Sequence, residues 1–445
     1  MPYQGGDRLS GERASKLGHL EIVKSTFVQS LIDQFEYPTE VEDSDEGTPW
    51  QALDLADVQP LTAVIAVDGS LQTVASDGLP KRALSFVKTA LVRLDRRAIE
   101  KIDKRMPHPV LMRELMRESA LQAATVFPLR NVRVPGLTNY DLVRNIIRDS
   151  LRIEADGLAH DTLKWLAYQK WSTDRRSSPR FACPHLSCGE ETKGLPYDAD
   201  DGTCEHCGGE LYLSDMIGFH REMSEDVAAE SLATAYMLIH ETLLLFSVIR
   251  FFWQQGDFGS LRNVLLIKDG PLTLRGQYSK LVPCIRNLFA FAKDKACPIH
   301  LIGQEKTGAF VDHLSEIGRF APPQTLDEPP SFAVLSHRYV REKVQLMPDR
   351  DNEYGLKTNY GEKVLVKLDP YCQMVISVPT GQYLDHPDKP ATASDLIGLR
   401  RILATLPSLV SYHNEGALIP INLANGVASL SSYPSAKVLK LFAGL

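Results

Sequence analysis

Two aspartates occupy matching positions in apolar segments that lie about 200 residues apart in the chain. Asp68 follows Val-Ile-Ala-Val and precedes a glycine, and Asp269 follows Val-Leu-Leu-Ile-Lys and also precedes a glycine. Each segment predicts a buried strand that carries a carboxylate at its C-terminal end, where glycine allows a sharp turn. The two pairs could be ordinary strand-to-turn sequences. Two acids presented in this way are also typical of a divalent-metal site, which is the hypothesis we pursue.

Hydrolysis of a phosphodiester with two metal ions requires further carboxylates near the same ions. The helix expected before the second strand offers four acids, Glu225, Asp226, Glu230 and Glu241. Glu241 lies in an apolar stretch, where a carboxylate is costly unless it is paired or bound to a cation. Glu230 lies three helical turns earlier on a similar face and is the alternative ligand. Either acid could instead be a salt-bridged or solvated helix residue.

Four cysteines form two short pairs, a CxxxxC and a CxxC, separated by a loop rich in glycine and aspartate: Cys183, Cys188, Cys204 and Cys207. Short loops of this kind bring two thiolates to one metal from each side, so the pattern predicts a structural Zn²⁺. His185 and His206 are possible substitute ligands. The zinc either holds together an insertion too small to have its own core, or forms a ribbon that contacts DNA or a partner protein.

The composition is that of a soluble globular protein, with 445 residues, 44% hydrophobic and 24% charged. The net charge is −7, so any binding of nucleic acid must use a local basic surface. The apolar stretch Tyr236–Trp253 is interrupted by His240, Glu241, Thr242 and Arg250, so it predicts a buried helix, with no membrane partner. Because the N-terminus lacks an apolar signal sequence, we expect a cytoplasmic protein. The other three cysteines are expected in the core: Cys284, Cys297 and Cys372.

Strands and helices are expected to alternate through most of the chain, which predicts an α/β fold. We expect an N-terminal helix and acidic linker (1–60), a first part of the core with a helical insertion (61–175), a zinc insertion (176–215) and a second part of the core (216–445). Local patterns add more specific predictions. They are one helix over Leu9–Tyr37, a strand at Thr62–Asp68 with Gln72–Ala75 returning beside it, helices at Pro109–Ala124 and Asn139–Trp171, and a hairpin of Val364–Leu368 with Gln373–Val378.

The order of these motifs resembles that of the NurA nucleases. The likeness rests on a strand ending in Asp-Gly-Ser, a glutamate on a later helix and a strand ending in Asp-Gly-x-Leu. It continues through four later segments: Leu301–Thr307, Ser336–Tyr339, Val364–Leu368 with Val375–Val378, and Pro420–Ala428. It covers roughly residues 60–75 and 225–435, by order and spacing more than by identity. Two departures are the zinc insertion and Asn425, where many members have a histidine or an acid; nearby His413 and Glu415 could compensate.

The resemblance implies a ribonuclease-H-like mixed sheet flanked by helices and a Mn²⁺- or Mg²⁺-dependent deoxyribonuclease that acts on DNA ends and single strands. Asp68, Asp269 and Glu241 or Glu230 would hold the metal, and Lys306 would contact the substrate phosphate. It also implies a homodimer that works with a HerA-type hexameric ATPase, in DNA end processing or in defence against phage. The alternative, favoured by Asn425, is a non-catalytic zinc-bearing subunit with a degenerate core that binds DNA or the ATPase.

Basic segments are candidates for contact with DNA. Lys81–Arg105 contains nine lysines or arginines and three acids, and it could line a channel for the phosphate backbone or simply form a solvated face. Arg175, Arg176 and Arg180 form a second basic patch before the first cysteine pair. Trp165 and Trp171 could stack on bases, although their helical spacing favours core packing.

Overall fold

The computed structural model describes residues 19–35, 50–106, 108, 111–112, 115, 120–224, 230–347, 354–384, 387–412, 416–430 and 434–445. The chain divides into two compact units, Met1–Glu46 and Gly47–Leu445. In the first unit the described residues form two short helices, α1 (His19–Lys24) and α2 (Thr26–Ile32). The single long helix expected here is therefore wrong for this part. Ser25 has an extended backbone and its hydroxyl accepts a hydrogen bond from the Val28 amide, so it ends one helix and caps the next.

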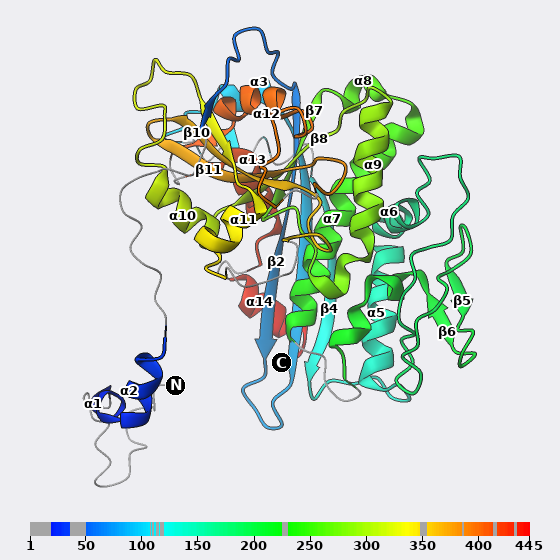
Figure 1. Ribbon diagram of the computed structural model, residues 1–445. Helices are drawn as coiled ribbons and strands as arrows, with labels where there is room; N and C mark the ends of the chain where they lie inside the picture. Colours follow the sequence, from blue (N-terminus) through cyan, green and yellow to red (C-terminus); the bar gives the residue numbers. More distant parts are fainter. Residues whose placement is uncertain are drawn as a thin grey trace. The chain divides into compact units, whose positions relative to one another are not determined.

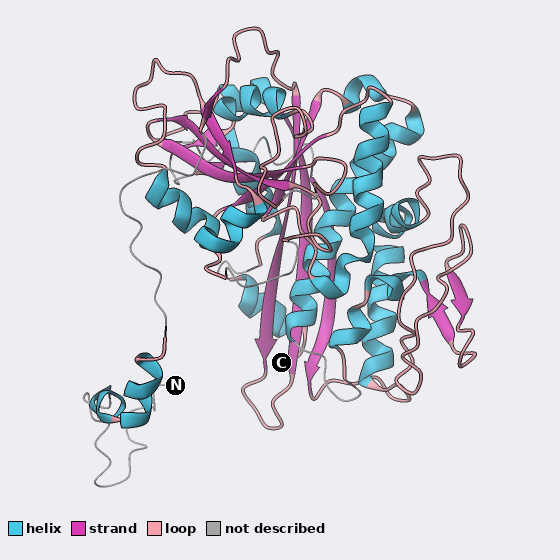
Figure 2. Cartoon of the chain, viewed as in Figure 1, coloured by secondary structure: helices cyan, strands magenta, loops and turns pink. Residues whose placement is uncertain are grey.

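The second unit is built on a nine-stranded mixed sheet with the order β1-β9-β10-β11-β8-β7-β2-β3-β4. Helices lie on both of its faces (Figure 2). The strands are β1 (Gln51–Ala52), β2 (Ala63–Ala75), β3 (Ala83–Asp95), β4 (Ala120–Arg130), β7 (Val264–Asp269), β8 (His300–Glu305), β9 (Ser331–Val334), β10 (Glu362–Asp369) and β11 (Cys372–Val378). Two small ribbons pair β5 (Asp201–Thr203) with β6 (Glu210–Tyr212) and β12 (Val410–Ser411) with β13 (Ala417–Leu418).

Among the described residues of this unit, the α-helices are of very unequal length. They are α3 (Arg96–Glu100), α5 (Asn139–Ile153), α6 (Leu158–Ala167), α7 (Glu230–Gln255), α8 (Phe258–Leu261), α9 (Val282–Asp294), α10 (Ala309–Ile317), α11 (His337–Tyr339), α12 (Leu399–Thr405), α13 (Ile419–Ala428) and α14 (Ser435–Phe442). The longest, α7, lies along β2 and β3 (Figure 1). Its segment Ser231–Gln255 is long and apolar enough to cross a membrane, but 78% of its most apolar window is buried in the protein, which is consistent with a soluble protein.

The central strands combine two kinds of pairing. β2 runs antiparallel to β3 and parallel to β7, and β7 runs parallel to β8. β4 is antiparallel to β3, and on the other side β11 is antiparallel to β8 and β10. The mixed α/β sheet and the β10–β11 hairpin therefore confirm the predictions made from sequence pattern.

The two faces of the sheet support separate cores. Ile65, Val67 and Leu266 pack with residues of α5, α6, α7 and α9. Their neighbours along the strands, such as Ala66 and Ile267, pack instead with α12 and α13. This alternation follows from the two-residue period of a strand. It fixes which side chains of β2, β7 and β8 face each helical layer.

Three local predictions are wrong. Gln72–Ala75 does not return beside Thr62–Asp68, because β2 continues without a turn and its antiparallel partner is β3. The C-terminal part of the helix expected over Pro109–Ala124 is the start of β4, whose backbone bonds to β3 override the helical propensity of alanine and leucine. The helix expected over Asn139–Trp171 is broken by three left-handed residues, Ala155, Asp156 and Gly157. Most of 107–119 lies outside the described residues.

Candidate metal centre

The two aspartates singled out in the sequence come together where the parallel pairing of β2 with β7 ends. β2 itself continues to Ala75, so the prediction that Asp68 lies at the C-terminal end of its strand is wrong, whereas Asp269 is the last residue of β7. The register of β2 with β7 ends at Val67 opposite Lys268, so Asp68 and Asp269 follow in the next row. Asp269 in turn pairs with Gln304 on β8. Because Ala66 and Ile267 face α13, the residues two positions later face the same side. Asp68, Asp269 and Gln304 thus form one row of polar side chains beneath α13.

The carboxylate of Asp68 is buried and only partly neutralised. Its side chain is 4% exposed, and its Oδ1 accepts the Gly69 amide at 2.8 Å. Burial, followed by repulsion from Asp269, raises its pKa, and the nearby side-chain amide of Asn425 on α13, the Gly69 amide and the charge of Lys306 oppose that rise. Its Oδ2 has no hydrogen-bond partner among the described residues. A bound cation would compensate this buried negative charge.

Glu241 reaches the same region from the opposite face of the sheet. It is 2% exposed on α7, and its Oε2 lies 3.7 Å from Nζ of Lys268. Its Oε1 lies only 2.5 Å from the point where a Cβ on Gly69 would be. Burial raises its pKa to about 8; the charge of Lys268 opposes this, and the charges of Asp68 and Asp269 add to it. Glu241 is therefore close to the two aspartates, but Lys268 lies beside it on the face of the sheet that is covered by α7.

The remaining candidates occupy the rim of the centre or lie outside the described residues. Nζ of Lys306 is 3.0 Å from Oδ1 of Asp269, and both side chains are about one-third exposed. Glu230 is the first residue of α7, and its side chain is not among those described. Residues 225–226 and 413–415 also lie outside the described part, so nothing is placed for the other acids or the histidine considered there.

Sequence reasoning missed two polar residues of this centre. Lys268 is buried next to Glu241, and Gln304 is fully buried in β8. The side-chain nitrogen of Gln304 donates to the carbonyl of Gly416, whereas its Oε1 has no partner among the described residues. The sequence did contain a signal for both residues, because each is a polar residue that directly follows an apolar strand sequence. Lys268 ends Leu-Leu-Ile-Lys, and Gln304 ends Leu-Ile-Gly-Gln.

The four predicted zinc ligands meet at a second place. Sγ of Cys183 lies 3.8 Å from Sγ of Cys207, and Sγ of Cys188 lies 3.9 Å from Sγ of Cys204. Tetrahedral Zn²⁺ with Zn–S bonds of about 2.3 Å would place its sulfurs about 3.8 Å apart. Among the described histidines, cysteines and acids, these four are the one group of three or more residues whose ligand atoms all lie within 4.8 Å of one another. The cluster could therefore hold a zinc ion.

The two histidines of the cysteine pairs have other partners. Nε2 of His185 lies 3.0 Å from the carbonyl of Glu210, and Nε2 of His206 lies 3.4 Å from that of Glu191. A side chain at Gly209 would collide with the ring of His185, so this ring is closely packed. Four thiolates then complete a tetrahedral site by themselves.

The insertion that carries the four cysteines (176–215), here called the zinc module after the ion it could hold, is fixed to α5 by a buried ion pair. Arg144 donates from Nε and Nη2 to the two carboxylate oxygens of Asp215 at 2.9 and 2.8 Å. It also donates to the carbonyl of Glu210 at 2.7 Å, and its guanidinium lies over the ring of Tyr212. The hydroxyl of Tyr140 donates to the carbonyl of Pro184, within the first cysteine pair.

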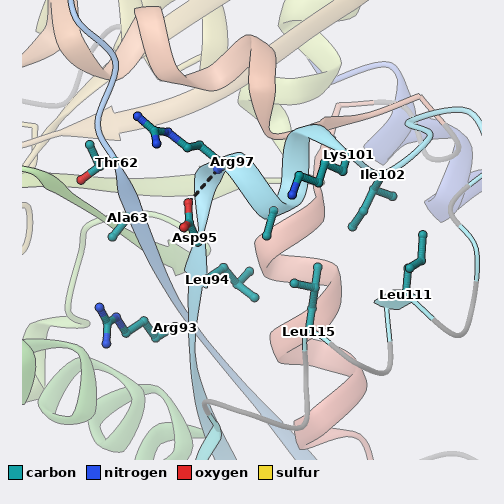
Figure 3. Close-up of a pocket in the computed structure, with 11 residues that line it drawn as sticks. Thr62, Ala63, Arg93, Leu94, Asp95, Arg97, Lys101, Ile102, Leu111 and Leu115 are labelled. Carbon is teal, nitrogen blue, oxygen red and sulfur yellow. Dashed lines mark hydrogen bonds between the residues drawn. The ribbon is translucent and has the colours of Figure 1, made fainter.

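Part of the basic segment Lys81–Arg105 borders a cavity of about 780 Å³ at the start of β2 and the end of β3 (Figure 3). Arg93, Arg97 and Lys101 line it together with apolar side chains including Leu94 and Ile102. The acids of this segment have local partners: Asp95 accepts the Arg97 amide, Glu100 pairs with Arg96, and Asp103 accepts the Arg105 amide. Within the described part of the chain, no ion pair joins the three basic side chains to an acid.

The other proposed nucleic-acid contacts are mixed in outcome. Trp165 and Trp171 are buried and pack edge to face, with ring centroids 5.0 Å apart, so the core interpretation is confirmed. Arg176 pairs with Asp174, and Arg175 lies near the ring of Tyr197.

The remaining three cysteines are buried in the core as predicted: Cys284, Cys297 and Cys372.

The polar row beneath α13 offers hard oxygen ligands of the kind that Mg²⁺ and Mn²⁺ prefer. Asp68 and Asp269 supply charge, Asn425 and Gln304 supply neutral amides, and Lys306 supplies a cation at the rim. Such an arrangement can bind a divalent cation and a phosphate beside it. A scan against models of known protein families finds no match for this chain, and no curated protein matches it.

Proposed function

We propose that this protein is a divalent-metal-dependent deoxyribonuclease with a ribonuclease-H-like core. The strand order β4-β3-β2-β7-β8 supports the fold, because three antiparallel strands are followed by two parallel ones, as in ribonuclease-H-like sheets. The NurA-like motifs lie on this framework in the order that the resemblance implies. They include the aspartates of β2 and β7, the glutamate of α7 and the lysine after β8.

The observation that carries the proposal is the under-neutralised carboxylate of Asp68 beside Asp269. Two acids held together where the parallel pairing of β2 with β7 ends, one of them with an unpartnered buried oxygen, are poorly compensated without a cation. Divalent cations are the usual compensation where carboxylates converge in phosphodiesterases. The fit of the donor atoms to Mn²⁺ or Mg²⁺ therefore supports hydrolysis of a phosphodiester rather than a purely structural role.

Each residue has a defined task in this proposal. Asp68 and Asp269 would hold the cation, which when bound supplies a Lewis acid and an activated water. The side-chain amide of Asn425, which lies near Asp68, would help to orient it. Lys306, now 3.0 Å from Asp269, is placed to donate to a phosphate oxygen of the substrate once Asp269 binds the cation. Glu241 would support β2 from beneath Gly69.

The biological setting in the proposal follows the resemblance. The protein would act as a homodimer on DNA ends and single strands, with a HerA-type hexameric ATPase that supplies the DNA. The reaction would serve either the processing of DNA ends in repair or defence against phage. A zinc ion on the four cysteines would stabilise the insertion that packs next to α5.

The test is a nuclease assay on linear duplex and single-stranded DNA with Mn²⁺. The wild type should cleave, and Asp68→Ala and Asp269→Ala should each reduce the rate by about a thousandfold, because several kcal/mol of metal-dependent stabilisation would be lost. Asp257→Ala is the matched control, since Asp257 caps α8 at the surface. Equal cleavage by the wild type and both site variants would refute the proposed centre.

A second candidate function is a non-catalytic subunit that binds DNA or the ATPase. It is favoured by the two lysines that already neutralise acids of the centre, Lys268 next to Glu241 and Lys306 next to Asp269. Asn425, a neutral residue where an acid or histidine is expected, points the same way. DNA binding by the wild type without cleavage, with or without the ATPase, would select this function.

A further inference from the structure

The polar row beneath α13 is a sharp change from the row that precedes it. Ala66, Ile267 and Ile302 lie side by side on β2, β7 and β8 and form part of an apolar core. The next row on the same face consists of Asp68, Asp269 and Gln304. Three adjacent strands thus exchange apolar for oxygen-bearing side chains at one level of the sheet. A neutral amide in this row needs an explanation, because it is as buried as the apolar residues below it.

The hydrogen bonds of Gln304 fix which way its amide points. Its Nε2 donates to the Gly416 carbonyl, and a carbonyl can only accept, so the nitrogen must face Gly416 and the oxygen must face away. That oxygen has no hydrogen-bond partner among the described residues. A buried amide oxygen normally has a donor or a cation beside it. Here the nearest residue of the row is Asp269, which offers only acceptors when ionised.

We infer that the side-chain oxygen of Gln304 is a ligand of the divalent cation, together with the carboxylates of Asp68 and Asp269. The inference rests on the proposed function for the presence of a cation. It adds a ligand from a third strand and assigns Glu241 a different role. Two carboxylates balance the charge of a divalent ion, and the amide adds an oxygen without adding charge.

Glu241 fits the ligand set less well than Gln304 does. α7, the helix that carries Glu241, lies on the other face of the sheet. The carboxylate of Glu241 lies beneath Gly69, and its Oε2 is 3.7 Å from Nζ of Lys268. Oε2 of Glu241 also has no hydrogen-bond partner among the described residues, but the charge of Lys268 lies beside it, whereas the unpartnered oxygens of Asp68 and Gln304 belong to side chains in the row that faces α13. We assign Glu241 as a positioning residue that holds β2 at Gly69 against α7.

The test is the affinity for Mn²⁺, measured by calorimetric titration of the full-length protein without DNA. Gln304→Ala should bind Mn²⁺ about tenfold or more weakly than the wild type, since a ligand atom is lost. Gln304→Glu should bind more tightly, because it places a charged oxygen at the same position. Gln122→Glu adds the same charge at an exposed position of β4 and should not change the affinity. Thermal unfolding without metal checks that each variant is folded.

The outcomes separate this inference from the proposed function. Unchanged Mn²⁺ affinity in both Gln304 variants would overturn the inference, even if the wild type cleaves DNA. Affinity that falls in Gln304→Ala and rises in Gln304→Glu would support it, even if no cleavage is found and the nuclease proposal fails. A wild type that binds no Mn²⁺ would overturn both.

Discussion

Gly69 lies where any other side chain would occupy the space taken by Glu241 and Met237. A Cβ at this position would come within 2.5 Å of Oε1 of Glu241 and 2.6 Å of Cγ of Met237. We predict that Gly69→Ala lowers the free energy of unfolding by about 1–3 kcal/mol through overpacking. Gly78→Ala is the control, because no atom lies within 4 Å of its added Cβ. Urea denaturation measures both, and equal stability of the two variants would contradict the packing described.

His300 is a second residue with a measurable consequence, at the buried start of β8. Burial, followed by the positive charge of Arg401, lowers its pKa to about 4. The folded pKa lies below the usual value of about 6.5, so between these two values the unfolded chain binds a proton that the folded chain does not. The stability associated with His300 is therefore fully present above about pH 6.5 and is lost as the pH falls towards 4. The loss is at most about 3 kcal/mol. Unfolding free energies at pH 7 and pH 5 should therefore differ less for His300→Gln than for the wild type; equal differences would refute this.

Among the elements of the structure, the zinc module is the one whose stability we expect to depend on a single cluster of side chains, the four cysteines. Its ribbon has strands of only three residues each, although Phe181, Leu195 and Leu211 pack into the main core. We expect a zinc ion on the four cysteines and the Arg144–Asp215 pair to add to this packing. We predict one zinc per wild-type chain by elemental analysis and loss of that zinc in Cys204→Ser. Hydrogen exchange should then rise between residues 181 and 212 and stay slow in β2 and β7.

The control for the zinc prediction is Cys297→Ala, a buried cysteine far from the cluster in sequence. It should keep the zinc and the slow exchange of the module. Zinc retained in Cys204→Ser, or exchange that rises across the whole sheet in that variant, would contradict a closed and separately stabilised module.

For the whole molecule, a net charge of −7 means that a nucleic acid must find a locally basic place. The cavity bordered by Arg93, Arg97 and Lys101 is such a place. We predict that Arg97→Glu with Lys101→Glu weakens binding of single-stranded DNA and lowers the salt slope of the affinity by about 0.7 per lost phosphate contact. Fluorescence anisotropy in EDTA measures this. The exposed Arg319→Glu is the control, and an unchanged slope in the double variant would exclude the cavity from DNA binding.

Short-range features of the fold and the site could be predicted from sequence, and features set by register could not. The cysteine spacing and the strands before Asp68 and Asp269 are local patterns. Gly270 has a φ of 81° and makes the expected turn, but Gly69 lies inside β2 and serves the approach of Glu241. Gln304 joins the row only through the parallel pairing of β7 and β8, which no local pattern specifies.

The central claim is that a divalent cation binds beside Asp68 and Asp269. The most direct measurement is an anomalous difference map from crystals grown with Mn²⁺ and recorded at the manganese absorption edge. The account predicts a peak within coordination distance of both carboxylates, and no peak at that place in crystals of Asp68→Ala. A wild-type map without a peak there, from crystals in which the polar row is ordered and accessible to solvent, would contradict it.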